Sequence, residues 1–374
     1  MKLLADCGGL VRRIALAIPA TFFDRINQPG DWAPLAPIGN LLDSMPNGIE
    51  AILLVDRIVM AHAERWVAGL TTVCDVTVCP VSDAAHPISI PWLQDVFHVR
   101  ELSSVSGAGH EYLSFSGAGA AMDLATLQGA ASKILPFHLD GGNQLIGSDF
   151  RIIGHSDFGK MEAIRALDKR PVHVFGYRVN DIVRPPAGLK GMPEADHHDL
   201  ASGMRQHSKM HQFGYHVDQF VTLTGLERVG KPLLVVGEPV ADGRFSRAID
   251  VARCSLDASV IFLEEQGFEV IRNQVPFAVT TDTRKLLPRL YNNAMLENDL
   301  REGKDRPLIW LPQFSDSEAL DETDQSNATL WEDLGFEVRK VFGWSHLASR
   351  SGALRCISKV IERCARQGKL NAKV

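Results

Sequence analysis

Runs of apolar residues alternate along the chain with stretches whose apolar positions recur at helical spacing. The run AILLVDR (51–57) is followed by HAERWVAGLTTVC, which has a helical pattern, and then by the β-rich DVTVCPV (75–81). The run KPLLVVGEP (231–239) also precedes a helical segment, which ends at Gly267 and is followed by the β-rich FEVIRNQV. This pattern predicts strands that alternate with helices, as in an α/β protein.

One arrangement of residues occurs twice, which indicates an internal repeat. A helical stretch ends in a glycine before Phe-Glu-Val in both EEQGFEVIR and EDLGFEVRK, and the apolar run RPLIWLP precedes the second of them. Units of roughly 60–80 residues would fit about five times into the 374-residue chain. A single unit could not bury its own faces, so the units should pack around a shared centre. A doubly wound parallel sheet is the alternative that the pattern leaves open.

The charge balance argues against a nucleic-acid partner. The net charge is −6, and no run rich in lysine or arginine appears. No apolar run approaches the roughly 20 residues of a membrane-spanning helix, so we expect no membrane partner. The segment IALAIPA after two arginines resembles a signal peptide weakly, but RIALAIP equally fits a first buried strand.

The six cysteines show no paired CxxC spacing, and a chain of this length does not need disulfide bonds to fold. We therefore expect reduced thiols and a cytoplasmic protein. Cys356 lies in SGALRCIS, after a small-residue turn and beside Arg355. A lone cysteine is most often a small core residue, whereas a nearby guanidinium favours a reactive thiolate if it points toward the sulfur.

Three other short motifs carry polar groups where strands should end: PWLQDVF, HLDGGNQ and HVDQF. Asp95 and Asp140, in the first two, occupy positions typical of turn formers, and the paired glycines after Asp140 allow close approach of the backbone to a ligand. If HVDQF is a strand, His216 and Asp218 share one face. A histidine in such a position is commonly structural, but it also titrates near neutrality.

Taken together, these residues suit one kind of chemistry. A cysteine nucleophile needs an acid or base within hydrogen-bond reach, and His216 is the best candidate. A guanidinium group is planar, cationic and rich in N–H donors, so carboxylates such as Asp95, Asp140 and Asp218 are natural partners for it. The set is consistent with nucleophilic attack of Cys356 on a guanidinium carbon.

The order Trp-x-x-Asp, acid-Gly-Gly-Asn, His-Val-Asp and a late cysteine resembles the guanidino-group-modifying, or pentein, superfamily. WLQDVF and HVDQFVTL are most similar to peptidyl-arginine deiminases, DGGN is similar to agmatine deiminases, and SGALRCIS is similar to the ending of arginine deiminases. RLYNNAMLEND (289–299) resembles the strand before the last unit of this family. The resemblance implies a five-bladed pseudo-symmetric α/β propeller that forms one catalytic domain over residues 1–374. Residues 1–30 are left open as an extra N-terminal element.

By this resemblance, Cys356 attacks the guanidinium carbon to give a thiouronium intermediate, and His216 acts as acid and then base. Asp95 and Asp218 hold the guanidinium nitrogens, and Asp140 orients the histidine from a position where the family usually has glutamate. The resemblance also assigns Trp92 and Asn143 to substrate binding, with no cofactor and no metal.

The implied activity is that of a deiminase that releases ammonia from arginine, peptidyl-arginine, agmatine or a related guanidine. No arginine lies between Arg100 and Arg151, where peptidyl-arginine deiminases use one to hold a peptide backbone, so a small guanidine is favoured. Oligomer formation is left open. An amidinotransferase and a guanidine-binding protein without turnover remain alternatives within the same fold.

A metallohydrolase is a rival from another class. Five histidines lie between positions 197 and 216, and two of them have the i, i+4 spacing that places ligands on one helical face. They are His197, His198, His207, His211 and His216. The missing HExxH arrangement argues against a zinc site of this type.

Overall fold

The computed structural model describes residues 2–25, 34–81, 91–104, 107–115, 119–178, 210–240, 246–279, 286–315 and 320–364. Strands and helices alternate along most of these ranges, which confirms the predicted α/β class. In the described part of the chain, no helix is long and apolar enough to cross a membrane.

One sheet brings a strand near the start of the chain beside a strand near its end. The strand order is β20 (Ser358–Cys364), β2 (Leu10–Ile18), β3 (Glu50–Asp56) and β4 (Asp75–Val81). β20 is antiparallel to β2, whereas β2, β3 and β4 are parallel. The parallel connections contain the helices η1 (Ala20–Arg25), α1 (Leu35–Ser44), η3 (Arg57–Val59) and α2 (Met60–Ala68). RIALAIP forms most of β2, as the strand interpretation predicted.

Two further sheets follow along the chain. The first has the order β1 (Lys2–Leu3), β5 (Phe97–Ser104), β6 (Gly107–Ser114) and β7 (Ala131–Ile134), with α3 (Gly119–Gln128) before β7. The second has the order β10 (Val172–Phe175), β9 (Arg151–Gly154) and β8 (Gln144–Ile146), with η5 (His155–Lys160) and α4 (Met161–Leu167) before β10. A short pair, β11 (Tyr177–Arg178) and β12 (Met210–His211), lies beside them.

The last two sheets contain the repeated sequence. One has the order β13 (Val221–Arg228), β14 (Lys231–Val240), β15 (Glu269–Val279) and β16 (Leu286–Pro288), with α6 (Ser246–Glu265) before β15. The other has the order β17 (Met295–Leu296), β18 (Leu308–Pro312) and β19 (Glu337–Val341), with α7 (Asp321–Asp333) before β19.

The repeated glycines end helices as predicted. Gly267 and Gly335 follow α6 and α7 with φ of +96° and +88°, a left-handed conformation that strongly favours glycine. The phenylalanine after each glycine, Phe268 or Phe336, is buried in one shared apolar cluster. The glycine therefore reverses the chain, and the phenylalanine anchors the following strand to the core.

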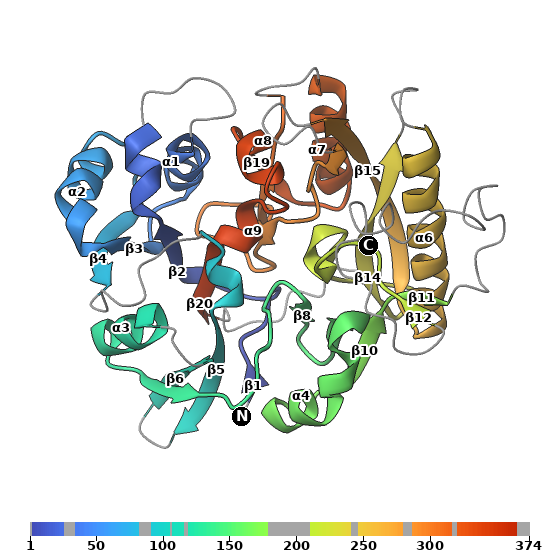
Figure 1. The fold of residues 1–374 in the computed structure, drawn as a ribbon, viewed down its shortest axis with the longest axis horizontal. Helices are drawn as coiled ribbons and strands as arrows, with labels where there is room; N and C mark the ends of the chain where they lie inside the picture. Colours follow the sequence, from blue (N-terminus) through green and yellow to red (C-terminus); the bar gives the residue numbers. More distant parts are fainter. Residues whose placement is uncertain are drawn as a thin grey trace.

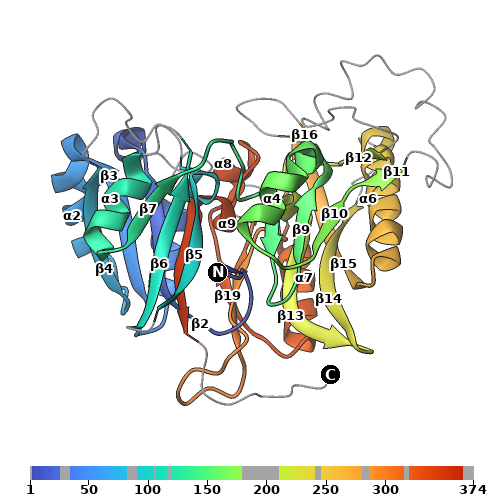
Figure 2. The ribbon, with the colours of Figure 1, turned by 90° about the horizontal axis from the view of Figure 1, so that it is seen from below.

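The same connection occurs five times in the described residues: an antiparallel pair of strands, a helix, and a third strand parallel to the second. The antiparallel pairs are β20/β2, β5/β6, β8/β9, β13/β14 and β17/β18. The parallel partners are β3, β7, β10, β15 and β19. In Figures 1 and 2 the sheets occupy the middle of the molecule, whereas α2 and α6 cover opposite outer sides.

HVDQF is not a strand, so that expectation was wrong. Residues Val217–Gln219 form the short helix η7, with His216 as its N-cap. The Gln219 side chain accepts hydrogen bonds from the backbone N–H groups of Tyr215 (2.7 Å) and His216 (3.2 Å), which closes the turn before the strand begins at Val221. Polar groups close to one another in sequence satisfied these donors locally, and a strand ladder was not needed.

Candidate active site

The five residues predicted to carry the chemistry come from four separate segments, since His216 and Asp218 share one, and meet near the middle of the molecule. Asp95 ends the helix η4 (Leu93–Asp95), Asp140 lies in the loop before β8, and Asp218 belongs to η7. Cys356 lies in α9 (Leu354–Ile357), which follows α8 (Ser345–Ala348) and is central in Figure 1. Loops and helix ends supply these groups, and the sheets hold the loops in place.

The paired glycines bring two of these segments into contact. The N–H of Gly142 donates to Asp95 Oδ1 at 2.7 Å. A Cβ atom at Gly142 would lie 2.5 Å from His216 Nδ1, and one at Gly141 would overlap the carbonyl oxygen of Gln94. No side chain fits at either position, so the pair is needed for close packing in addition to its turn.

His216 is buried and lies between two carboxylates. Its Nε2 is 3.5 Å from Asp140 Oδ2, and its Nδ1 is 3.8 Å from Asp95 Oδ2. Burial lowers the pKa of His216, but the close carboxylate of Asp140 and the charges of Asp95 and Asp218 outweigh burial and raise the pKa above its ordinary value. The imidazole is therefore stabilised in its protonated form, which can donate a proton.

The two carboxylates beside His216 differ in their proton affinity. Burial raises the pKa of Asp95 to about 6. Burial also acts to raise the pKa of Asp140, but the close imidazole of His216 and the hydrogen bond with His138 outweigh it and lower that pKa to about 2. Asp140 thus stays ionised at any ordinary pH, whereas Asp95 titrates in the mildly acid range.

Asn293 holds the Cys356 thiol in place. Its Nδ2 lies 3.1 Å from Cys356 Sγ, and its Oδ1 accepts the Cys356 N–H at 3.0 Å. Burial raises the pKa of the thiol, and the charges of Asp218 and Asp95 raise it further, whereas Arg355 opposes this effect only weakly. Without a bound cation the sulfur is therefore a thiol.

Arg355 pairs with carboxylates and does not contact the sulfur in the way that would favour a thiolate. Its Nη1 donates to Asp218 Oδ2 at 2.7 Å, and its Nη2 donates to Asp6 Oδ1 at 2.9 Å. Asp218 is fully buried, and its Oδ1 has no hydrogen-bond partner among the described residues. Since a buried carboxylate oxygen without a donor is costly, this atom is suited to an N–H group of a ligand.

The loop before Cys356 packs tightly on Trp92. Ser351 has a φ of +67°, an uncommon value for a residue other than glycine, and its carbonyl accepts a hydrogen bond from the Gln219 side chain at 3.0 Å. A Cβ atom at Gly352 would overlap the indole ring of Trp92. The Trp92 ring therefore packs directly against the loop that precedes Cys356.

The backbone N–H of Asn143 donates to the carbonyl of Asp140 at 3.2 Å, but its side chain has other partners. Its amide nitrogen donates to Ser156 and Asp157, and its amide oxygen accepts from Gln212 at 3.0 Å. The side chain is buried, and these bonds join it to the helix η5 and to the residue that follows β12. This geometry is that of a residue that fixes the loop after Gly142.

Some residues of this site were missed in the sequence. Asn293 lies in RLYNNAMLEND, where the paired asparagines in an apolar setting were the available signal, but the segment was interpreted as a strand from its resemblance to the family. Met295–Leu296 form the short strand β17, whereas residues 289–294 are a turn between β16 and β17. Asp6 belonged to no recognisable motif, because its partner Arg355 lies far away in sequence. Gln219 lay inside HVDQF, but its bonds depend on the turn at η7, which was not predicted.

Among the described residues, one group of side chains lies close enough together to bind a metal ion. The ligand atoms of Asp95, Asp140 and His216 lie within 4.8 Å of one another. His211 lies in β12 outside that group, and its ring stacks on Tyr177. Three histidines of the rival metal prediction, His197, His198 and His207, fall outside the described residues.

Comparison with known proteins gives structural but not sequence matches. Searches against protein-family models and against curated proteins find no match. An agmatine deiminase from C. jejuni superposes with a TM-score of 0.59 at 10% identity, over 96% of this chain and 95% of that one.

Two further structures give comparable matches. A structure described as a putative peptidyl-arginine deiminase gives a TM-score of 0.58 at 13% identity over 98% of both chains. An agmatine deiminase of Enterococcus faecalis gives 0.60 at 10% identity, over 97% of this chain and 96% of that one. The chain therefore has the fold of these deiminases, which confirms the predicted resemblance to the pentein superfamily at the level of the fold.

Proposed function

We propose that the protein is a cysteine-dependent hydrolase of a guanidino group. The observation that carries this proposal is the fully buried Oδ1 of Asp218, which has no partner among the described residues. The Cys356 sulfur lies nearby, 3.8 Å from the other oxygen of the same carboxylate. A donor-rich cation would satisfy Oδ1 and would bring its carbon close to the thiol.

In the proposed complex, Asp218 and Asp95 accept N–H groups of the guanidinium. The bound cation lowers the pKa of the Cys356 thiol because it offsets the two carboxylates that raise it. The thiol proton leaves to solvent, and binding of the substrate thus generates the nucleophile. Trp92 supports the loop that carries the sulfur.

The first half of the reaction breaks a carbon–nitrogen bond. The Cys356 thiolate attacks the guanidinium carbon, and the electron pair of one C=N bond moves to nitrogen. Protonated His216 donates its proton to the departing nitrogen, which leaves as ammonia. The product of this half is a thiouronium cation bound to Cys356.

The second half regenerates the enzyme. Neutral His216 takes a proton from a water molecule that attacks the thiouronium carbon, which gives a neutral tetrahedral adduct. The thiolate leaves as the C=O bond forms, and the hydroxyl proton that is released passes through solvent to ammonia, which becomes ammonium. Asp140 stabilises the imidazolium in both halves and fixes its orientation. The net reaction converts a guanidinium and water into a ureido product and ammonium.

We further propose that the five repeated units are the blades of a five-bladed α/β propeller in a single domain. The agreement with deiminase structures over nearly the whole chain supports this proposal. A small cytoplasmic guanidine is the favoured substrate, and peptidyl-arginine is the alternative.

The test is incubation of the purified protein with agmatine, arginine and a peptidyl-arginine, with ammonia and the ureido product measured together. Equal amounts of both products are expected from at least one substrate. Transfer of the amidino group to an added amine would instead indicate an amidinotransferase, and binding without any product would indicate a guanidine-binding protein.

The metallohydrolase alternative needs a separate control. Activity that persists after treatment with a chelator is expected, because no step of the proposed reaction uses a metal. Loss of activity with a chelator and its recovery with Zn²⁺ would contradict the proposed mechanism.

A further inference from the structure

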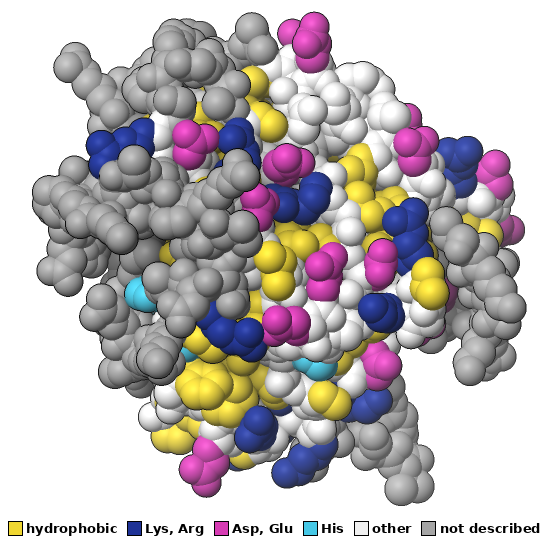
Figure 3. All heavy atoms as spheres, turned by 90° about the vertical axis from the view of Figure 1, so that its right-hand side faces the viewer, with side chains coloured by type: hydrophobic (Ala, Val, Ile, Leu, Met, Phe, Trp, Pro, Cys, Tyr) yellow, Lys and Arg dark blue, Asp and Glu magenta, His cyan; other side chains and the backbone are white. Residues whose placement is uncertain are grey.

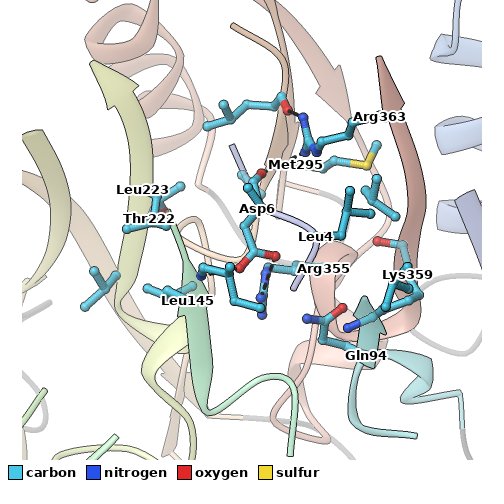
Figure 4. A pocket seen from close by; sticks show the side chains of 18 of the residues that line it. Leu4, Asp6, Gln94, Leu145, Thr222, Leu223, Met295, Arg355, Lys359 and Arg363 are labelled. Atoms are coloured by element: carbon cyan, nitrogen blue, oxygen red, sulfur yellow. Dashed lines mark hydrogen bonds and ion pairs between the residues drawn. The ribbon is translucent and has the colours of Figure 1, made fainter. Parts of the chain in front are cut away.

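A cavity lies beside Arg355, outside the candidate active site. Its volume is about 40 Å³, and none of the five predicted chemical residues lines it. Mainly apolar side chains form its walls, together with the charged residues Asp6, Arg355, Lys359 and Arg363 (Figure 4).

Lys359 is buried in the wall of this cavity without an ionic partner. The residue is 6% exposed, and no hydrogen bond or ion pair joins its side chain to any residue in the described ranges. Its Nζ lies 5.9 Å from the centroid of the Phe97 ring. Figure 4 shows its amino end beside Gln94, at the edge of the cavity.

Arg363 also lacks a carboxylate partner among the described residues. Its guanidinium donates to the backbone carbonyls of Asp6 (2.7 Å), Gly8 (2.9 Å) and Leu296 (3.0 Å). Its buried Nε has no hydrogen-bond partner in the same part of the chain. These bonds satisfy most of its donors but do not neutralise its charge.

Basic side chains outnumber acidic ones in the cavity wall. Arg355, Lys359 and Arg363 line the cavity with one carboxylate, Asp6, which is bound to Arg355. Asp218 and Asp95 do not line it; Asp218 is bound to Arg355, and the charges of both also act on Lys359. The nearby Glu297 is bound to Arg301 and does not compensate the excess. His98 is neutral, because burial and the charge of Lys359 lower its pKa to about 3.

A buried ammonium without a counter-ion is costly, so a counter-ion in the cavity would be strongly favoured. We propose that the cavity binds one small monovalent anion, a halide or a carboxylate of one or two carbons, against Lys359. The volume corresponds to about three water molecules at roughly 10–15 Å³ each, which excludes larger anions.

The anion would also stabilise the ammonium form of Lys359. Burial lowers the pKa of this lysine to about 8, and an adjacent anion opposes that shift. Since Arg355 joins the cavity to Asp218, the site is next to the candidate active site but does not depend on the proposed reaction.

Bromide is the first probe, because it replaces chloride and scatters anomalously. Crystals of the wild-type protein soaked in sodium bromide should show an anomalous peak in the cavity within hydrogen-bond distance of Lys359 Nζ. The same soak of Lys359→Met should show no peak. A wild-type cavity without bromide would overturn the proposal for halides, and the same crystals soaked in formate or acetate would decide whether a carboxylate binds there.

Thermal unfolding tests the same site in solution. At equal ionic strength, sodium chloride, formate or acetate should raise the Tm of the wild type by about 2–4 °C relative to sodium gluconate, whose anion is too large for the cavity. Lys359→Met should lose this difference, and the exposed control Lys340→Met should keep it. Equal Tm values in all four salts, or an unchanged difference in Lys359→Met, would overturn the proposal. If Lys359→Met does not fold, the wild-type soaks still decide.

Discussion

At the scale of single residues, the site depends on the Asp218 carboxylate, whose two oxygens have different surroundings. Asp218 gives Oδ2 to Arg355 at 2.7 Å and leaves Oδ1 buried without a donor from the described residues. Arg355 thus fixes the orientation of the carboxylate while the second oxygen stays available. Asp95 differs, since its Oδ1 is held by the Gly142 N–H and its pKa is raised to about 6 by burial.

Asp95 should determine how activity depends on pH in the acid range. Above about pH 6 its carboxylate is ionised and attracts the guanidinium, and below that value protonation removes the charge. We expect kcat/KM of the wild type to fall as the pH drops through about 6. Asp95→Asn should lose on the order of 100-fold in kcat/KM, as expected when one charged partner of a buried contact is removed. The kcat/KM of this variant should no longer fall as the pH drops through about 6. If kcat/KM of Asp95→Asn still falls at low pH as in the wild type, Asp95 is not the group that controls this decline.

Asn293 should act as a positioning residue that keeps the thiol reactive. In Asn293→Asp, a carboxylate replaces the amide nitrogen 3.1 Å from Sγ and raises the pKa of the thiol. We expect the rate of alkylation of Cys356 to fall about tenfold or more at neutral pH, which corresponds to one pKa unit, and to recover at alkaline pH. A purely structural role would lower the rate equally at every pH, so the pH dependence of alkylation distinguishes the two.

At the scale of elements, the regular strands and helices were the predictable part. The run at 231–239 corresponds closely to β14, whose central residues are continuously buried. The run at 75–81 corresponds to β4, which is only partly buried but rich in valine and threonine, residues that favour strands. The short helices η7 and α9 were not predicted, since their bonds depend on side chains such as Gln219 and on contacts with distant loops. The motifs indicated which polar residues to consider but not the bonds they make. Asn143, for example, was predicted to bind substrate, but its side chain binds Ser156, Asp157 and Gln212.

The loop around Gly352 has no regular secondary structure, and its conformation depends on close packing against Trp92. We expect Gly352→Ala to lower the free energy of unfolding by about 1–3 kcal/mol and to reduce turnover, because the new methyl group would overlap the Trp92 ring. Gly159→Ala is the matched control, since a Cβ atom at that position would have no neighbour within 4 Å among the described residues. Urea denaturation measures both variants, and equal stabilities would show that the loop relaxes freely.

At the scale of the whole molecule, buried ion pairs join segments that the sheets keep apart. Arg355 in α9 binds Asp218 before β13 and Asp6 after β1. The face shown in Figure 3 differs from this interior, because its basic and acidic side chains are interspersed and exposed to solvent. The charges that specify the relative position of the units are therefore internal, and composition alone could not reveal them.

Arg355→Met should strongly destabilise the fold. The substitution leaves Asp218 buried without its cation, and breaking such a pair costs about 3–5 kcal/mol. Arg339→Met, which removes a partly exposed pair with Glu337, should cost only about 0–1 kcal/mol. Urea denaturation of the two variants should give clearly different midpoints, and similar midpoints would contradict the structural role of Arg355.

The most direct test of the central claim is intact-protein mass spectrometry after incubation with a small haloacetamidine, a guanidinium-shaped electrophile. The wild type should gain a single adduct at Cys356, and agmatine or arginine should prevent it. Cys356→Ser should gain none, and His216→Ala should react more slowly. No adduct, or adducts spread over several cysteines without protection by a guanidine, would contradict an activated thiol in a guanidinium site.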